Sequence, residues 1–397
     1  MLPKARLISA LEHKEGDRVP VGELHADWDI VERALGHRTY VYSQWREWVA
    51  EWEGRRDEVV ESYKRDLIDL ARKFEWDFVV VPVVPARRQQ YGMPEMLGGY
   101  TWRDGSGRVW RYSPETGGAA MLVEAPHLGI GDIGVPPEFQ FDETCLEAVR
   151  HVVKELGGTH FVVGRPPDPT FPWRYMAGFA DLLVRTVTEP EFFCKAVAAC
   201  LPGAIAWVNA MCDLGVDGIT MGVDYCDNRG PFMGPQLFRR LILPALGEVC
   251  RAVHARGKHF IKHCDGNTWS ILDDFVEVGV DGWHGIQPSI GMDFKLLKER
   301  FAGRLCLFGG VNCDTLVSST PAEVAKEVKY AIRHTASGGG LVLTSGNSLL
   351  VGTRYENYLA MLGAARDYGG YPSRLEDPTE SPACADVEPS KQDQGAV

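Results

Sequence analysis

The sequence predicts an α/β fold, a (β/α)8 TIM barrel, from the number of its apolar runs, the helical patterns between them and the polar residues that end them. Eight short apolar runs lie along the 397 residues, and each ends in polar residues or glycine. Eight parallel strands are the number that closes such a barrel. The runs cover residues 18–25, 77–84, 160–167, 218–225, 259–266, 282–289, 305–312 and 341–348.

Amphipathic helical patterns separate the runs regularly from the fourth run onward. Residues 268–280 and 320–336 carry apolar side chains at i, i+3 and i+4 spacing, as the crossover helices of parallel strands do. Thr320 before Pro321 predicts a helix N-cap followed by proline in the first turn. The rival fold, a doubly wound sheet, needs a glycine-rich phosphate turn after its first strand, and residues 22–28 contain none. The barrel is therefore preferred.

We expect one barrel domain over residues 1–373, with an insertion after the second strand. Aromatic and polar residues alternate within residues 98–126, which predicts one or two β-hairpins. The aromatic side chains of this insertion, Trp102, Trp110 and Tyr112, either seal one rim of the active site or form the hairpin's own small core.

Composition excludes several classes of partner. The 42 Lys and Arg against 54 Asp and Glu give a formal charge of −12, which disfavours nucleic acid and anionic membranes. Ten cysteines without a CxxC pair indicate free thiols and a cytoplasmic protein. No uninterrupted apolar run reaches the length of a membrane span. Residues 374–397 are rich in Pro, Ser and acids and poor in aliphatics, so we expect a disordered acidic tail.

Ionisable residues lie near the C-terminal ends of several predicted strands, and these ends meet in the mouth of a parallel barrel. Glu23 and His25 are two residues apart and therefore share a face, as do His263 and Asp265. Such side chains suit a divalent metal, most plausibly zinc, or acid–base catalysis. The candidate metal ligands are Glu23, His25, His263 and Asp265, and the candidate catalytic residues are His263, Asp224 and Glu23.

A further set of residues near the strand ends is expected to orient a substrate. Arg165 either pairs with a substrate carboxylate through its planar guanidinium or forms a salt bridge with Asp168. The structural alternative for the polar residues is capping, since Asp and Asn commonly accept hydrogen bonds from the helix that follows. The candidate substrate-binding residues are Arg165, Gln287, Asn312, Asn347 and Trp283.

Three segments after residue 258 carry a family resemblance, and they read KHCDGNTWSILDDFVEVGVDGWHGIQP, GGGLVLTSGNSL and YENYLAMLGAARDYGGY. Further upstream, GVDYCDNRGPFMGPQLFRRLILPAL follows the fourth predicted strand in the same way. Together they resemble the uroporphyrinogen decarboxylase superfamily, which also contains the corrinoid-dependent methyltransferases. The resemblance implies the barrel fold and an active site at its mouth, and it leaves a homodimer open because this fold often pairs subunits.

Departures from the family motifs narrow the function that the resemblance implies. The true decarboxylases carry an arginine-rich segment after strand one, where this chain reads GELHADWDI. The thiol-activating methyltransferases carry His-x-Cys on strand five and a further Cys on strand eight, and the matching positions here are His263, Asp265 and Asn347. Loss of soft thiolate ligands argues against thiol methylation, while harder ligands suit a zinc ion that polarises an ether oxygen.

The resemblance therefore implies a methyltransferase that takes a methyl group from a small methylated substrate, such as a methoxylated aromatic or a comparable O- or N-methyl compound. The acceptor would be the cobalamin of a separate corrinoid protein, because the chain shows no Asp-x-His-x-x-Gly segment of its own. Two alternatives stay open. One is a metal-free decarboxylase or lyase that uses His263 and Asp224 as acid and base, and the other is a non-catalytic ligand-binding member of the family.

Overall fold

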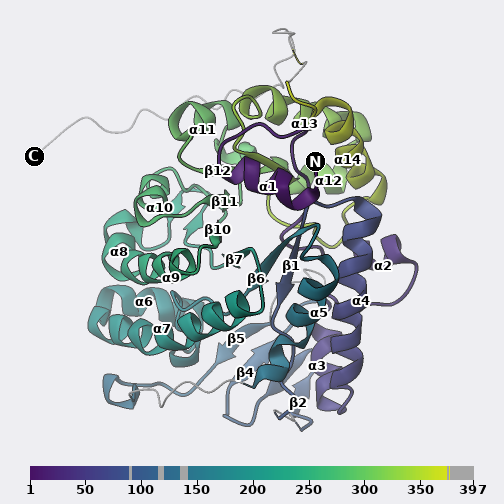
Figure 1. Ribbon diagram of the computed structural model, residues 1–397. Helices are drawn as coiled ribbons and strands as arrows, with labels where there is room; N and C mark the ends of the chain where they lie inside the picture. The colour runs from purple at the N-terminus through teal and green to yellow at the C-terminus, as the bar shows by residue number, and fades with distance from the viewer. Residues whose placement is uncertain (89–91, 115–119, 135–141, 373–374, 376–397) are drawn as a thin grey trace, which may run out of the picture.

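A parallel, curled sheet of seven strands forms the centre of the molecule (Figure 1). The computed structural model describes residues 1–88, 92–114, 120–134, 142–372 and 375. The strands lie side by side in chain order, as expected for the barrel fold that the sequence predicted. They are β1 (Phe78–Pro82), β6 (Phe161–Arg165), β7 (Gly218–Met221), β10 (His259–His263), β11 (Gly282–His284), β12 (Cys306–Val311) and β13 (Leu341–Ser345).

The predicted first strand, residues 18–25, is not a regular strand, which corrects that element of the prediction. It nevertheless lies between β13 and β1: Pro20 accepts a hydrogen bond from the Leu343 N–H at 2.8 Å, and Val21 accepts one from the Asp77 N–H at 2.7 Å. The regular backbone ladder with β13 stops because the Glu23 carboxyl accepts two hydrogen bonds from Ser345. The Ser345 N–H donates at 3.0 Å and the Ser345 hydroxyl at 2.7 Å. A side chain thus occupies the next position of the ladder.

Helices surround the strands and follow the alternation that the sequence predicted. The helix predicted at residues 320–336 begins at Pro321, and Thr320 caps it by accepting the Glu323 N–H at 3.4 Å while the Glu323 carboxylate accepts from the Thr320 N–H. The helices are α1 (Pro3–Leu11), α2 (Trp28–Leu35), α3 (Gln44–Trp52), α4 (Arg56–Phe74), α5 (Glu147–Leu156), α6 (Phe179–Thr188), α7 (Pro190–Asp213), α8 (Gly234–Leu241), α9 (Leu243–Ala255), α10 (Leu272–Val278), α11 (Phe294–Phe301), α12 (Cys313–Ser318), α13 (Pro321–Thr335) and α14 (Tyr355–Tyr368).

Two apolar clusters divide the core. Side chains that alternate along the strands point either to the helices or to the barrel interior. The interior cluster gathers at the N-terminal ends of the strands, with Phe78, Phe161 and Cys306 at strand starts, and α1 packs on it through Leu7 and Leu11. Helix α1 closes this end of the barrel with apolar side chains. A site for polar groups and ligands is therefore expected at the opposite end.

The insertion after β1 contains a four-stranded antiparallel sheet that packs beside α3 (Figure 1). Trp102 in its second strand contacts Trp45, Trp48 and Trp52 of α3, with ring centroids 5.7, 5.1 and 5.4 Å away. Residues 115–119 of the predicted hairpin region lie outside the described residues, as does nearly all of the predicted tail. The strands are β2 (Glu95–Gly98), β3 (Thr101–Arg103), β4 (Val109–Arg111) and β5 (Met121–Glu124), and a separate short ribbon pairs β8 (Cys226–Asp227) with β9 (Gly230–Pro231).

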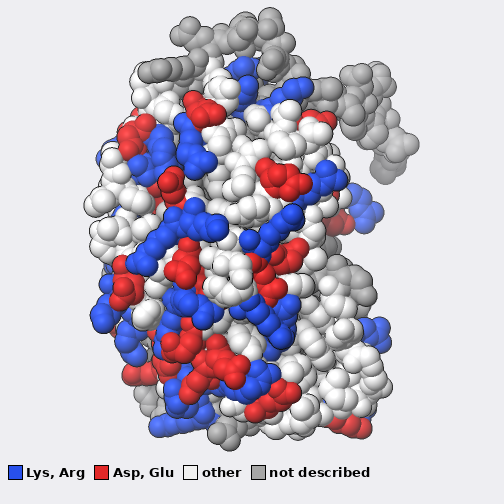
Figure 2. Space-filling view, turned by 90° about the vertical axis from the view of Figure 1, so that its right-hand side faces the viewer, with Lys and Arg blue, Asp and Glu red and all other residues white. Residues whose placement is uncertain are grey.

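The surface carries both signs of charge. Figure 2 shows basic and acidic side chains intermixed over the face that carries α4, where Arg55 pairs with Glu58 at 2.9 Å and Lys64 with Glu61 at 2.7 Å. Helix α7 is long and apolar enough to cross a membrane, and a third of its most apolar window is buried. In this fold it packs between α6 and α9, as a crossover helix of the barrel does.

The buried Glu23 carboxyl makes stability depend on pH. Burial raises the pKa of Glu23 to about 8, against the lowering effect of its hydrogen bonds with Ser345. The folded chain thus holds a proton that the unfolded chain releases, so this stabilisation is complete below the ordinary pKa of 4.5 and is lost as the pH rises through 8. The loss amounts to about 1.4 kcal/mol per pH unit between these values.

We expect Glu23→Gln to remove this slope, because the amide keeps the size of the side chain and an acceptor for Ser345 but cannot ionise. Urea unfolding of wild type and variant between pH 5 and 9 measures it, with Glu15→Gln at an exposed position as the control. Parallel stability curves for wild type and Glu23→Gln would show that Glu23 is already ionised in the folded chain.

Candidate active site

A small cavity of about 210 Å³ lies at the C-terminal ends of the barrel strands. We call it the barrel cavity. Its walls come from the irregular first segment, from the start of α3 and from the ends of β6, β7, β10, β11 and β13, as the barrel fold requires. The lining residues are Leu24, His25, Gln44, Arg165, Thr220, Gly222, Asp224, His263, His284, Asn347 and Ser348.

Two histidines and one aspartate meet in this cavity. The Nδ1 atoms of His263 and His284 are 2.7 Å apart, so one ring donates a proton to the other. The Nε2 atom of His263 lies 3.4 Å from the Asp224 carboxylate. Burial, together with the charges of Arg165 and Lys262, lowers the pKa of His263 to about 3. His263 is therefore neutral at physiological pH, the state in which imidazole binds metals or accepts protons.

The carboxyl groups near His263 hold their protons more firmly than usual. Burial raises the pKa of Asp224, although Lys262 and Arg165 oppose this effect. Burial and the nearby Asp224 charge raise the pKa of Asp265 to about 7. The Asp265 N–H donates to the Asp224 carboxylate at 3.2 Å, so the two residues form one coupled group. At neutral pH this group can store a proton.

Asp265 connects the barrel cavity to a neighbouring hollow. Its carboxylate accepts a hydrogen bond from the Asn347 amide at 2.6 Å, and Asn347 lines the barrel cavity. On its other side, Asp265 lines a hollow of about 310 Å³ together with Gln287, which accepts the Gly266 N–H at 2.7 Å. Gln287 therefore lines the neighbouring hollow, whereas His263 lines the barrel cavity.

Arg165 carries the positive charge of the barrel cavity. The sequence offered two partners for Arg165, a substrate carboxylate or Asp168. In the structure Asp168 pairs with the buried Lys262 at 3.1 Å. Among the described residues no carboxylate oxygen lies within 4.0 Å of Arg165. The Tyr42 hydroxyl lies beside it. A guanidinium that has a hydroxyl beside it but no carboxylate partner is suited to bind the carboxylate of a ligand.

Gly222 makes room for this arrangement. A Cβ atom at this position would come within 2.9 Å of the Arg165 Nη2 and 3.7 Å of the His263 Cδ2. Any larger residue would have to displace the guanidinium.

Five of the predicted site residues do not line the barrel cavity: Asp265 and Gln287 line the neighbouring hollow, and three others are held elsewhere by the fold. Glu23 is bound to Ser345, as described above. Trp283 is completely buried in the core and donates its indole proton to the Cys264 carbonyl at 2.8 Å. The Asn312 amide donates to Glu327 of α13 at 3.3 Å, because Asn312 precedes α12 and faces the outer helices. These three predictions are corrected: the residues support the fold around the site. His25 does line the cavity, where its ring lies 4.0 Å from that of Tyr42 and its Nε2 lies 3.2 Å from Asp27.

Sequence reasoning missed the roles of three residues. Lys262, His284 and Gln44 were not among the predicted site residues, although the last two line the cavity. Lys262 is fully buried and also donates to the Val223 carbonyl at 2.8 Å, which fixes the chain just before Asp224. A lysine within the apolar run FIKHCD was a usable signal, because a buried ammonium needs partners.

The predicted zinc ion can be tested against the donor atoms. A tetrahedral zinc with bonds near 2.0–2.2 Å separates two of its ligands by about 3.4 Å. The His263 Nε2 and Asp224 carboxylate oxygen are 3.4 Å apart, which fits this spacing. Among the residues that the structure describes, however, no three His, Cys, Asp or Glu side chains are grouped to hold one metal ion. The described residues thus offer a fitting pair of ligands rather than a complete set.

Comparison with known proteins agrees with this architecture. Residues 129–368, more than half of the chain, match the family described as uroporphyrinogen decarboxylase (URO-D). The Methylcobamide:CoM methyltransferase MtaA of Methanosarcina barkeri is 24% identical over 224 residues, which cover 56% of this chain and 63% of that protein. The protein of the same name from strain Fusaro is 23% identical over the same length.

A solved structure extends the likeness beyond the matched residues. A methyltransferase from Methanosarcina mazei superposes with a TM-score of 0.69 at 20% identity, covering 93% of this chain and 99% of that one, so it shares the fold. The strand order and the cavity at the barrel mouth are consistent with the family match over residues 129–368. This chain belongs to the uroporphyrinogen decarboxylase (URO-D) family.

Proposed function

We propose that this chain transfers a methyl group from a small O-methylated substrate to the cobalt of a separate corrinoid protein. The observation that carries the proposal is the barrel cavity, where the Arg165 cation lies beside neutral His263 and beside Asp224, whose pKa burial raises. The two Methanosarcina barkeri relatives are named as methyltransferases between a methylcobamide and CoM, which supports corrinoid methyl chemistry. The match spans only 63% of the length of those relatives. The activity of the whole chain is therefore part of the proposal.

A methoxylated aromatic acid is the substrate class that the cavity favours. Arg165 would bind the carboxylate through two parallel N–H donors. A cavity of roughly 150 Å³ holds one benzene molecule. The 210 Å³ of the barrel cavity is therefore a suitable size for one substituted ring. None of the residues that line it is a cysteine, so the described lining offers no thiolate to activate a thiol substrate.

The reaction needs a proton on the leaving oxygen. The methyl carbon leaves the ether without the electron pair of the C–O bond, and cobalt(I) supplies both electrons of the new carbon–cobalt bond. The C–O pair stays on the phenolate oxygen, which then takes a proton. Asp224 is suited to give it in its protonated form, which burial favours by raising the pKa of this carboxyl. His263, 3.4 Å from Asp224, holds the carboxyl in place.

Zinc remains a prediction of this proposal. His263 and Asp224 would hold it, and a bound zinc would act as a Lewis acid on the ether oxygen. The role given to Arg165 does not depend on zinc. Asp224 would be ionised as a zinc ligand, so in the zinc form the Lewis acid would take the place of the Asp224 proton.

A second candidate function is a metal-free decarboxylase or lyase. It is favoured by the same pair, because His263 and Asp224 are in position for acid–base work while the described residues give no third metal ligand. Release of carbon dioxide from an aromatic acid without methyl transfer would identify it.

His263→Ala tests the metal and the reaction together. We expect about one zinc per wild-type chain after reconstitution and loss of it in the variant, because one of two fitting ligands is gone. Methylation of free cob(I)alamin by methoxybenzoate, followed by absorbance, should slow about 100-fold or more. His254→Ala is the matched control, since His254 is exposed on the outside and pairs with Asp281.

The outcomes separate the candidate functions. Methyl transfer without zinc would reject the Lewis acid and keep the methyltransferase. Wild-type rates in His263→Ala would contradict a role for the barrel cavity in the reaction.

Gly222→Ala tests the role of Arg165 in binding the substrate carboxylate. The added methyl group would displace the guanidinium, so we expect the dissociation constant of methoxybenzoate, measured by calorimetry, to rise about tenfold or more. Arg165→Gln should have the same effect, and both should leave methoxybenzyl alcohol, which lacks the charge, unaffected. Gly363→Ala is the control, because a Cβ there meets nothing within 4 Å. Unchanged methoxybenzoate affinity in both variants would place the carboxylate elsewhere.

A further inference from the structure

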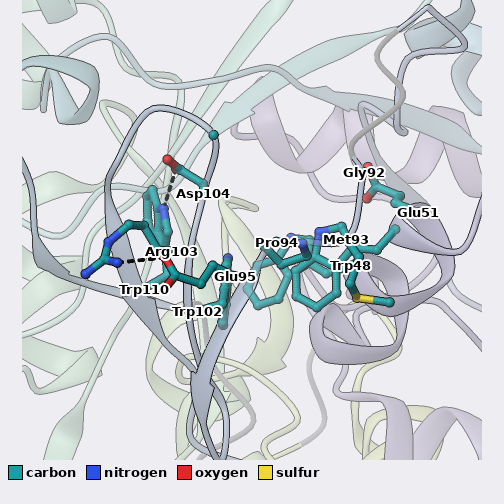
Figure 3. A pocket seen from close by; sticks show the side chains of 12 residues that line it. Trp48, Glu51, Gly92, Met93, Pro94, Glu95, Trp102, Arg103, Asp104 and Trp110 are labelled. Carbon is teal, nitrogen blue, oxygen red and sulfur yellow. Dashed lines mark hydrogen bonds and ion pairs between the residues drawn. The ribbon is translucent and has the colours of Figure 1, made fainter.

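A second, larger cavity lies between α3 and the antiparallel sheet of the insertion (Figure 3). Its volume is about 780 Å³, and it shares no lining residue with the barrel cavity. We call it the tryptophan pocket, because four indole rings form much of its wall. The lining residues are Trp48, Glu51, Trp52, Gly92, Met93, Pro94, Glu95, Trp102, Arg103, Asp104, Gly105 and Trp110.

The indole rings come from two elements and pack against one another. Trp48 and Trp52 are four residues apart on α3 and therefore share a face of the helix. Their rings lie 5.1 and 5.4 Å from Trp102 of the sheet, inclined at 53° and 66°. Trp110 is fixed by the hydrogen bond from its indole nitrogen to Asp104 at 2.8 Å. The rings thus form a preformed aromatic wall with ring faces in several directions.

Two acidic groups that line the tryptophan pocket, Asp104 and Glu51, have no cationic partner among the described residues, and only Glu51 also lacks a hydrogen-bond partner there. Glu95 pairs with Arg103 at 2.7 Å, and Asp104 accepts hydrogen bonds from Trp110, Ser106 and Arg108. Glu51 has no such partner: among the described residues no Lys, Arg or His nitrogen comes within 4.0 Å of its carboxylate. Burial raises the pKa of Glu51 to about 7, which Arg56 only partly opposes. The carboxylate therefore stands in the pocket without compensation.

We propose that the tryptophan pocket binds an organic cation of the methylated ammonium class. Indole faces attract such cations, whose charge is spread over methyl groups and is therefore easily desolvated. Glu51 would supply the missing counterion from α3, opposite the sheet residues (Figure 3). An anionic ligand is disfavoured, because Arg103 is already neutralised by Glu95 and Glu51 would repel it.

This binding site is additional to the proposed methyl transfer and does not rest on it. Gln44 at the start of α3 lines the barrel cavity, and Trp48, one helical turn later, lines the tryptophan pocket. The helix α3 is therefore a wall of both, although each cavity has its own polar groups.

The test compares choline with 3,3-dimethylbutan-1-ol, which has the same shape without the charge. Calorimetry on the full chain should show choline binding at least tenfold more tightly than the neutral alcohol. Glu51→Gln, which keeps the size of the side chain, should abolish this preference. Glu53→Gln is the matched control, because Glu53 is exposed one residue beyond α3 and pairs with Arg55.

Two further variants locate the binding site. Trp48→Leu should weaken choline binding at least fivefold, whereas Asp224→Asn in the barrel cavity should leave it unchanged. Equal binding of choline and the alcohol, or an unchanged preference in Glu51→Gln, would overturn the proposal. So would loss of choline binding in Asp224→Asn alone, which would place the cation in the barrel cavity.

Discussion

The closure of the barrel by an irregular segment is the constraint on which the site depends. Asp77 is completely buried at the start of β1, accepts the Val21 N–H at 2.7 Å and returns its own N–H to the Val21 carbonyl. Arg18 approaches the same carboxylate at 3.0 Å. Further along the segment, the Glu23 carboxyl accepts the Ser345 N–H, which in a regular strand would pair with a backbone carbonyl. Through these contacts the segment bends into the mouth and brings His25 to the cavity wall.

The sequence predicted the fold well because its signal was local. Runs such as 305–312 combine a continuous stretch of apolar residues and glycine with a polar residue at the end, and the helical patterns between the later runs have an apolar face that repeats every three to four residues. The first run failed as a strand for a reason that periodicity cannot reveal. Its ladder is completed by the Glu23 side chain, and this substitution of side chain for backbone depends on Ser345, more than 300 residues away.

Prediction of the site was limited in the same way. The rule that residues two apart share a face paired His25 with Glu23 and His263 with Asp265, but only the two histidines line the cavity. It could not show that Asn312 turns outward to Glu327, or that Lys262 takes Asp168 and so leaves Arg165 free for a ligand. Those pairings join side chains 15 and 94 positions apart, and only the folded arrangement decides between them.

The two cavities differ in charge, and one set of contacts holds the helix between them. The Tyr63 hydroxyl of α4 accepts the Tyr42 N–H at 3.1 Å and donates to Glu47 at 2.9 Å, which fixes the start of α3 to the barrel. Tyr42 in turn lies against His25. A ligand that draws Glu51 into the tryptophan pocket would therefore act on a helix whose first turn carries Gln44 in the barrel cavity. Because α3 is a wall of both cavities, the hydrogen bonds of Tyr63 hold Gln44 and Trp48 in fixed positions relative to the barrel.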